Sequence, residues 1–219
     1  CWQSAVTFPA TQVSEQNGLP HLVAVSTQSE ICRRGFKYVW RLGMSSEHQN
    51  GQGIDFVEDM GKRTGKVAKR AAFLALDDNY GKSSTEDFKK RIKKTDIQEV
   101  VEEIYYPPKA TNLDVEVAKL KAASPDVIYM SGYLTDANLI MRAFHAQKLQ
   151  TMGNITGGGG YVDPKFLEMI GPLSNHLYSV SSWDYEMNRS LEKEFDAKVR
   201  ARYKVEANHH SALLYSAIY

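Results

Sequence analysis

The stretch that decides the fold is VAVSTQSEICRRGFKYVWRL, residues 23–42. It predicts a buried strand, the pair Ser26-Thr27, a short polar helical turn, Gly35 and a second strand rich in aromatic residues. Hydroxyls at the carboxyl end of a strand lie where open α/β sheets place their ligand-binding groups. Such hydroxyls can hold a small polar ligand without catalytic machinery, so the stretch indicates a binding site.

Strands and helices alternate along the rest of the chain. Hydrophobic strands and amphipathic helices follow one another without hairpin signals, which predicts an α/β fold with parallel, doubly wound sheets. The expected strands are 21–26, 36–42, 67–76, 97–105, 126–131, 150–156 and 177–182. The expected helices are 4–16, 46–62, 82–94, 112–123, 135–147, 164–170, 190–203 and 208–219.

Polar links at the ends of two strands predict a two-lobed architecture. The links are RLGMSS at 41–46 and SSWD at 181–184, and the βα units between them are enough for a compact lobe. We expect lobe one to comprise 1–44 and 185–219, and lobe two to comprise 45–184. The first lobe is expected to be incomplete, because no strand precedes the first helix and the last helical pattern runs to the end of the chain.

Composition argues against several classes of protein. The 27 basic and 26 acidic residues nearly cancel, and the basic run KKRIKK at 89–94 has the spacing of a solvated helix face. Nucleic acid is therefore not an expected partner. No apolar run is long enough to cross a bilayer, so direct membrane insertion is not expected. The only cysteines are Cys1 and Cys32, and their spacing alone does not establish a disulfide.

Several motifs resemble catalytic or cofactor sites but lack a required part. GKSS at 81–84 has Leu76 where a phosphate-binding loop needs glycine. GGGG at 157–160 does not continue as the dinucleotide fingerprint, so a ligand-approach loop is favoured. His209 and His210 have no further metal ligand at helical spacing. No G-x-S-x-G elbow occurs. We therefore expect neither an enzyme, a metal nor a cofactor.

The pattern ST-x3-I-x3-GF-x4-R of residues 26–41 resembles that of the periplasmic solute receptors of ABC importers, the leucine/isoleucine/valine-binding type with the type I periplasmic binding fold. The resemblance extends over essentially the whole chain. It implies a receptor that captures a small carboxylate-bearing solute, a branched-chain or other amino acid, between two lobes. It also implies delivery to an ABC permease, hinge bending at 41–46 and 181–184, and a periplasmic or lipid-anchored extracytoplasmic location.

The resemblance further implies ligand-binding residues in lobe one. Ser4 corresponds to the serine that binds the ligand carboxylate at a helix N-terminus, where free N–H groups and the helix dipole favour an anion. Val25 and Thr27 correspond to the family's backbone and hydroxyl contacts. Each has a structural alternative, since Ser4 can be an N-cap and the other two can be a buried strand end with a helix-capping threonine.

Tyr80 in DDNYG and Tyr133 in MSGYLTDA correspond to the family's pocket tyrosines in lobe two. A single tyrosine would more often be a core or surface aromatic, but these two stand at equivalent strand ends of successive βα units. His210 falls where the family often has an aromatic residue, in the opening turn of a first-lobe helix. These three residues complete the expected cleft together with the glycine loop.

Gly159 departs from the family pattern. Amino-acid receptors of this type carry an acidic side chain here that neutralises the ligand's ammonium. A buried unpaired charge costs several kcal/mol, whereas micromolar binding amounts to only about 8 kcal/mol. Either Asp136 or Asp163 compensates, or the ligand is a non-amino-acid carboxylate, an aromatic acid or an amide.

Two other functions stay open at this point. The same lobes could form a sensory ligand-binding module with a kinase or DNA-binding partner, although the chain has no helix-turn-helix pattern. An α/β enzyme would need a titratable residue with a shifted pKa beside a nucleophile in the cleft.

Overall fold

The computed structural model describes residues 2–184, 187 and 190–218. The strands are β1 His21–Val23, β2 Val39–Arg41, β3 Arg70–Leu76, β4 Glu99–Tyr106, β5 Val127–Ser131, β6 Gly153–Thr156 and β7 Leu177–Ser179. The α-helices are α1 Ser4–Gln16, α2 Ser46–Thr64, α3 Asn79–Ile92, α4 Asp114–Ala123, α5 Leu134–Ala146, α6 Pro164–Ile170, α7 Ser190–Tyr203 and α8 His209–Ser216. The 3-10 turns are η1 Ser29–Cys32, η2 Gly159–Val162 and η3 Gly171–Ser174.

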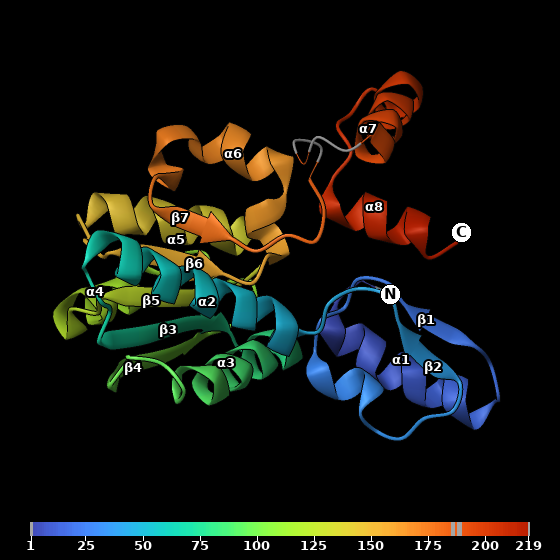
Figure 1. Cartoon of the computed structure of the whole chain (residues 1–219), viewed down its shortest axis with the longest axis horizontal. Helices are drawn as coiled ribbons and strands as arrows, with labels where there is room; N and C mark the ends of the chain where they lie inside the picture. The colour runs from blue at the N-terminus through green and yellow to red at the C-terminus, as the bar shows by residue number, and fades with distance from the viewer. Residues whose placement is uncertain (1, 185–186, 188–189, 219) are drawn as a thin grey trace.

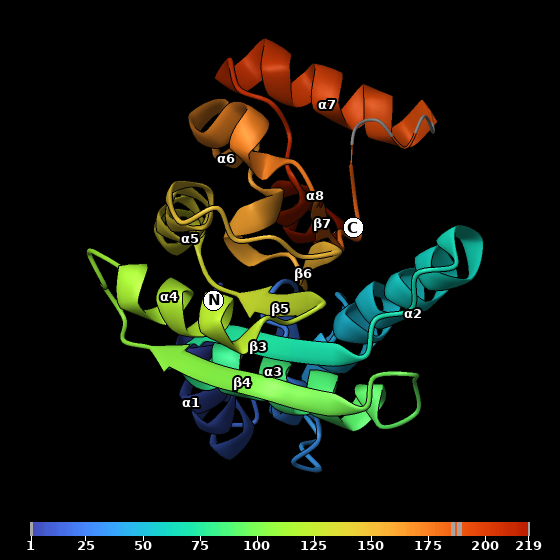
Figure 2. The ribbon, with the colours of Figure 1, turned by 90° about the vertical axis from the view of Figure 1, so that its left-hand side faces the viewer.

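The large unit, α2 to β7, confirms the expected parallel, doubly wound α/β fold. Its five strands are all parallel, in the order β4-β3-β5-β6-β7, with helices on both faces (Figure 1 and Figure 2). Phe73 of β3 packs with Ile54 of α2 and Phe88 of α3, whereas Leu74 packs with residues of α4 and α5 on the opposite face. Because side chains alternate along a strand and both faces are covered, β3 is apolar almost throughout.

The strand order reverses between β3 and β5. The chain passes from β3 to β4 on one side, and then crosses to β5 on the other side. In open parallel sheets such a reversal creates a crevice outside the carboxyl ends of the strands, where ligands bind. Tyr80 follows β3 and Tyr133 follows β5, so the two predicted pocket tyrosines flank the reversal.

The small unit comprises α1, β1, η1 and β2, and its two strands are parallel. Val23, Ile31 and Val39 form its buried core. Both strands are shorter than the expected 21–26 and 36–42. Beyond β1 the carbonyl oxygen of Ser26, the last residue of the expected strand, accepts a hydrogen bond from Arg41 Nη1 at 2.5 Å and not from a neighbouring strand.

The predicted crossings, residues 41–46 and 181–184, lie at the two ends of the large unit. Residues 41–46 lead from β2 into α2, and residues 181–184 follow β7. The lobe boundaries themselves stay a prediction, and several residues that follow the second crossing lie outside the described part of the chain. Cys1 also lies outside it, so the structure does not describe the Cys1–Cys32 alternative. Cys32 is half-buried at the end of η1.

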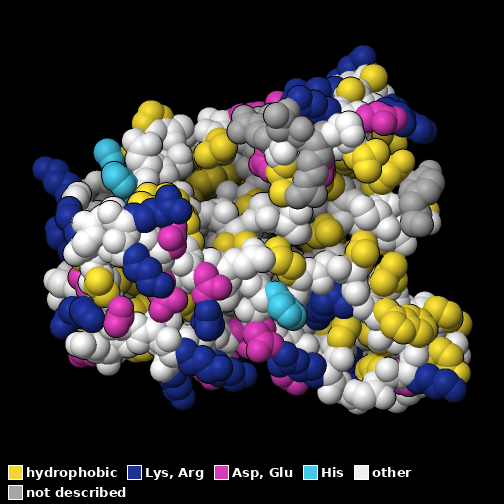
Figure 3. Space-filling view, viewed as in Figure 1, with side chains coloured by type: hydrophobic (Ala, Val, Ile, Leu, Met, Phe, Trp, Pro, Cys, Tyr) yellow, Lys and Arg dark blue, Asp and Glu magenta, His cyan; other side chains and the backbone are white. Residues whose placement is uncertain are grey.

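The surface differs between the two units. Figure 3 shows acidic and basic side chains interspersed over the large unit, whereas hydrophobic side chains gather at the lower right, over the small unit. Leu22 and Trp40 contribute to the exposed apolar surface of β1 and β2. Within the described ranges, no helix combines the length and apolar composition needed to span a membrane.

A buried cluster of polar side chains joins the two units. Asp87 Oδ2 of α3 accepts hydrogen bonds from Ser29 Oγ of η1 at 2.8 Å and from Ser46 Oγ of α2 at 2.5 Å. Ser83 Oγ of α3 accepts a hydrogen bond from the Ser29 N–H at 3.3 Å. Buried polar groups need such partners. The cluster therefore holds the small unit against α3 beside the crossing at 41–46.

Asp87→Ala is expected to lower the free energy of unfolding by about 2–3 kcal/mol, because it leaves the buried hydroxyls of Ser29 and Ser46 without their acceptor. Glu86→Ala, on the same helix, removes only an exposed ion pair with Lys89 and is expected to cost less than about 1 kcal/mol. Urea denaturation of both variants measures the difference. Equal costs would contradict the role of Asp87 as the acceptor that joins the units.

Candidate functional site

A small cavity lies between the two units and α8. Its volume is about 30 Å³ and its lining consists of Trp2, Ser4, Val25, Ser26, Thr27, Gln49, Tyr80, Tyr133, Gly159, His209 and His210. All seven predicted site residues are in this lining, and their role in binding stays a prediction. Ligand pockets usually measure about 300–1,000 Å³. This cavity is therefore much smaller than a typical ligand pocket.

The small unit contributes the start of α1 and the end of β1. Ser4 is the buried first residue of α1, and its Oγ accepts a hydrogen bond from the Gln28 N–H at 3.4 Å. The N-cap position belongs to Gln3, not to Ser4. Val25 and Thr27 lie two and four residues after the end of β1. A helix N-terminus and a hydroxyl-bearing strand end thus border the same space, which suits an anionic group.

Aromatic rings line the opposite side of the cavity. Tyr80 lies in the first turn of α3, Tyr133 is the N-cap of α5, and their ring centroids are 5.7 Å apart. The Trp2 ring lies 5.4 Å from that of Tyr133 and 5.2 Å from that of His210. Rings at these separations pack favourably against one another and against an apolar ligand.

Burial keeps the tyrosine hydroxyls protonated. It raises the pKa of Tyr80 and that of Tyr133 well above their ordinary values. The Tyr133 hydroxyl donates to Asp78 Oδ2 at 3.4 Å, while Asp78 Oδ1 accepts from the Gly81 N–H at 2.8 Å. Burial also raises the pKa of Asp78. This carboxylate lies behind Tyr133 and is not part of the lining.

The two histidines of the lining are neutral at pH 7. Burial lowers the pKa of His209 to about 4, and it also lowers the pKa of His210. His209 Nδ1 accepts a hydrogen bond from the Ser182 N–H at 3.3 Å, which requires the unprotonated nitrogen. Since no aspartate, glutamate, lysine or arginine occurs among the described lining residues, the cavity wall carries no formal charge.

Neither carboxylate named as a replacement for the missing acid lines the cavity. Asp136 Oδ2 accepts from the Tyr133 N–H at 2.9 Å and caps α5. Asp163 Oδ1 accepts from the Lys165 N–H at 2.9 Å and caps α6. Both carboxylates therefore accept hydrogen bonds from backbone N–H groups at the start of a helix.

Gly159 has no room for a side chain. A Cβ there would collide with the Gly132 carbonyl oxygen and lie 2.9 Å from the Tyr80 hydroxyl oxygen, and φ is +64°. L-residues with side chains rarely adopt this left-handed backbone. The acid that the family pattern places here is therefore incompatible with the packing of this loop, and its absence is part of the local structure.

Four residues of the lining are not among the seven predicted from the sequence, although the Ser26-Thr27 pair was indicated as a binding position. Ser26 and His209 stand beside predicted residues, and Trp2 is two positions from Ser4, so their proximity was the available signal. Ser26 Oγ donates to the Trp2 carbonyl oxygen at 2.8 Å and holds that end of the chain at the cavity. Gln49 had no such signal, because a glutamine in the first turns of a helix is usually solvated.

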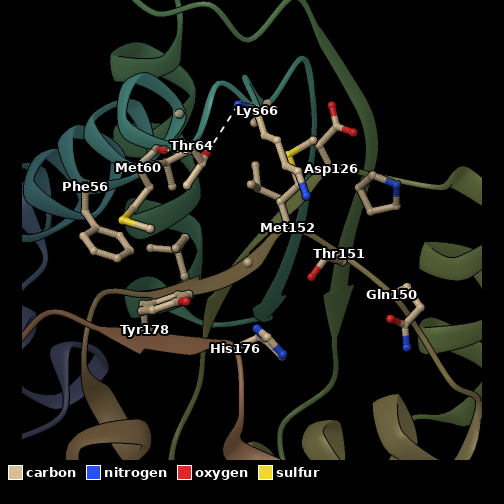
Figure 4. A pocket seen from close by; sticks show the side chains of 17 residues that line it. Phe56, Met60, Thr64, Lys66, Asp126, Gln150, Thr151, Met152, His176 and Tyr178 are labelled. Atoms are coloured by element: carbon tan, nitrogen blue, oxygen red, sulfur yellow. Dashed lines mark hydrogen bonds between the residues drawn. The ribbon is translucent and has the colours of Figure 1, made fainter.

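A larger hollow lies at the other end of the sheet. It measures about 650 Å³, and Figure 4 shows Phe56 and Met60 of α2 on the same side as Tyr178 of β7, whose ring centroid lies 4.8 Å from that of Phe56. Lys66, Asp126 and Met152 border it from the segments that enter β3, β5 and β6. These are the amino ends of the strands, whereas parallel sheets bind ligands at the carboxyl ends. The smaller cavity is thus the candidate site.

Comparison with known proteins agrees with this arrangement. A family model described as periplasmic binding protein matches residues 1–219. The chain belongs to the periplasmic binding protein family. This is a family of solute-binding proteins and not a catalytic family.

Individual periplasmic binding proteins resemble the chain at low identity. A "Leu/Ile/Val-binding protein homolog 8" of Brucella abortus is 24% identical over 209 residues, which cover 92% of this chain and 52% of that protein. The leucine-binding protein LivK of Thermotoga maritima superposes with a TM-score of 0.85 at 20% identity, covering 100% of this chain and 60% of that one.

A second solved structure is a solute-binding protein of an ABC transporter from Rhodopseudomonas palustris, in complex with 3,4-dihydroxybenzoic acid. It has a TM-score of 0.80 at 19% identity, with 99% of this chain and 58% of that one covered. These superpositions confirm the fold of the type I periplasmic binding proteins. The chain spans about half the length of the curated relative it matches.

Gly159→Ala is expected to destabilise the protein by more than about 2 kcal/mol, because the new methyl group meets backbone and the Tyr80 ring as well as unfavourable φ. Gly35→Ala is the matched control. Gly35 also has a positive φ, of +72°, but nothing lies within 4 Å of its Cβ position, so only the backbone cost of about 1 kcal/mol applies. Thermal and urea denaturation measure the stability that each variant loses. The loss in Gly159→Ala minus the loss in Gly35→Ala gives the cost of the packing clash without the backbone cost.

His209 is expected to make stability depend on pH. Its imidazole has a pKa of about 4 in the native state and an ordinary value of 6.5. The unfolded state therefore binds more protons between these values, and the stabilisation is complete above pH 6.5 and is lost as the pH falls towards 4. The loss amounts to at most about 3 kcal/mol.

Urea denaturation at pH 7 and pH 4.5 tests this expectation. His209→Gln should lose less stability on acidification than the parent protein. Any pH dependence that comes from Asp78 and Asp136 is the same in both proteins, so the difference reports on His209. His145→Gln, at an exposed helix position, should behave as the parent protein does. An unchanged acid sensitivity of His209→Gln would show that the imidazole is accessible to protons in the native state.

Proposed function

We propose that the protein is an extracytoplasmic receptor that captures a small carboxylate-bearing solute between two lobes and presents it to an ABC permease. The observation that carries the proposal is the common lining formed by the seven predicted residues, six from the two units and His210 from α8, at the carboxyl ends of the strands and at the reversal of strand order. Family membership supports the receptor class. A periplasmic location, with a lipid anchor in the parent protein, is part of the same proposal.

The carboxylate of the solute binds on the small-unit side. The first N–H groups of a helix have no intrahelical partners, and α1 starts at the cavity with Ser4. Thr27 adds a half-buried hydroxyl from the end of β1. This arrangement holds a negative charge with neutral dipoles and needs no lysine or arginine.

The other end of the solute meets an uncharged, aromatic wall. An α-amino acid would bring its ammonium against Tyr80, Tyr133 and Gly159, where the described lining offers no carboxylate. Removing an ammonium from water without a partner is costly. The geometry therefore favours a carboxylate without an ammonium group over a branched-chain amino acid. The R. palustris relative in complex with a dihydroxybenzoic acid supports this choice.

Ligand binding is proposed to close the two units about the crossings at 41–46 and 181–184. The cavity of about 30 Å³ must open to admit a solute. Ser29 and Ser46, on either side of the first crossing, bond to Asp87 when the units are together. Closure then presents one particular surface to the permease.

A thermal-shift titration tests the proposed solute class. Leucine, valine and phenylalanine are compared with their deaminated acids and with benzoate. At 100-fold excess over Kd a true ligand adds about 2.7 kcal/mol of stability. We expect stabilisation by the acids and little effect of the amino acids.

Stabilisation by the amino acids alone would contradict the proposal that the uncharged wall disfavours an ammonium group. It would indicate that a carboxylate of the protein moves into the cavity on closure. If no carboxylate stabilises the protein, the receptor function as proposed is contradicted. Ser4→Ala provides the internal check, because it should weaken binding of every acid to a similar degree.

A further inference from the structure

One residue of the cavity lining is largely exposed to solvent. Trp2 is 47% exposed, whereas every other described residue of the lining is buried or half-buried. A side chain that borders the cavity and also faces the solvent lies where the two meet. The ring of Trp2 therefore belongs to the mouth of the cavity.

The Trp2 ring contacts rings from two other parts of the chain. Trp2 stands just before α1 of the small unit, and its ring centroid lies 5.4 Å from that of Tyr133 in the large unit. The same ring lies 5.2 Å from that of His210 in α8, with the two planes at 83°. Tyr80 continues the row, 5.7 Å from Tyr133. Four rings carried by α8, the small unit and the large unit thus follow one another across the cavity.

The backbone of Trp2 is fixed to the small unit. Ser26 Oγ donates a hydrogen bond to the Trp2 carbonyl oxygen at 2.8 Å, and Ser26 is 3% exposed. The hydroxyl of Thr7, on α1, is bonded to the same Ser26 oxygen. The Trp2 ring can therefore leave Tyr133 only if the side chain rotates or if the two units move apart.

We infer, on the basis of the proposed function, that Trp2 is the gate of the cavity. The cavity of about 30 Å³ is far smaller than a solute, so part of its wall has to move for uptake. The exposed Trp2 ring closes the mouth by packing on Tyr133 and His210, and it leaves Tyr133 when a solute enters or leaves. Trp2 thus sets the rates of solute exchange, and Ser26 is a positioning residue that acts through it.

Thiol labelling inside the cavity tests the gate without any ligand. Val25 lines the cavity and is 6% exposed, and Val25→Cys introduces a small apolar thiol there. Iodoacetamide reaches this thiol only when the wall opens. Cleavage after Glu15 and Glu30 separates position 25 from Cys1 and Cys32, so mass spectrometry follows each thiol by itself.

Trp2→Ala, made in the Val25→Cys protein, is expected to speed the labelling of position 25 about tenfold. It removes two ring contacts, each worth up to about tenfold in an equilibrium constant. Trp2→Phe keeps a ring and should give a smaller increase. Cys32 is not part of the lining and should react at its former rate in both variants.

Trp40→Ala is the matched control. Trp40 is 51% exposed, which is close to the value for Trp2, and it lies on β2 of the same unit but outside the lining. Removing this ring should leave the labelling of position 25 unchanged. Equal acceleration by Trp40→Ala and Trp2→Ala would overturn the gate.

Ser26→Ala tests the positioning role. It should speed the labelling of position 25 by less than Trp2→Ala does, because the Trp2 ring is loosened but still present. In the double variant it should add little to Trp2→Ala, since a residue that acts only through Trp2 has no effect once the ring is gone. An undiminished effect of Ser26→Ala in the absence of the ring would overturn this role.

Failure of the gate is distinguishable from failure of the receptor function. If position 25 reacts equally fast with and without the Trp2 ring, or if Cys32 is accelerated to the same degree, the gate is overturned. The receptor function is tested with 3-phenylpropanoate and 4-methylpentanoate, the deaminated acids of phenylalanine and leucine. A bound acid should slow the labelling of position 25 and dissociate faster from Trp2→Ala. If neither acid protects position 25 or stabilises the protein, the receptor function fails, and the labelling rates without ligand still decide the gate.

Discussion

The close packing of the glycine loop after β6 is the constraint on which the site depends. At Gly159 and Gly160 a Cβ would collide with the Gly132 carbonyl and with the peptide between Tyr133 and Leu134. The loop therefore lies directly against the end of β5. This approach brings Tyr80, Tyr133 and the loop to one place, and it excludes a charged side chain from the position where it would be most effective.

The glycine loop after β6 also contacts helix α2, through which the large unit is joined to the small unit. The loop after β6 also lies close to α2, since Gln49 fills the space beside Gly158 and bonds to the Val180 carbonyl after β7. Helix α2 begins at Ser46, which shares Asp87 with Ser29 of the small unit. The helix that borders the cavity is thus also the helix that receives the first crossing.

Much of the fold could be predicted from the sequence, because each strand ends in a recognisable polar or glycine-rich loop. Tyr80 and Tyr133 could be placed because they follow the ends of β3 and β5, and helix α1 begins at Ser4 as expected. The strands of the small unit are shorter than the pattern indicated, and the Ser26 carbonyl oxygen at the end of the first expected strand is bonded to the Arg41 side chain. Gln49 could not be found in this way. Its burial comes from tertiary contacts with segments more than a hundred residues away.

A site built from neutral groups must select by hydrogen-bond geometry. Burial lowers the pKa of His209 and His210 and raises that of Tyr80 and Tyr133, so each of these groups is held in its uncharged form. A charged wall would attract any ligand of opposite sign, because Coulomb attraction depends weakly on orientation. Donors and acceptors at fixed positions reject a solute that leaves them unpaired. With no room for a side chain at Gly159, the described lining offers a ligand hydrogen-bonding groups and rings but no charged side chain.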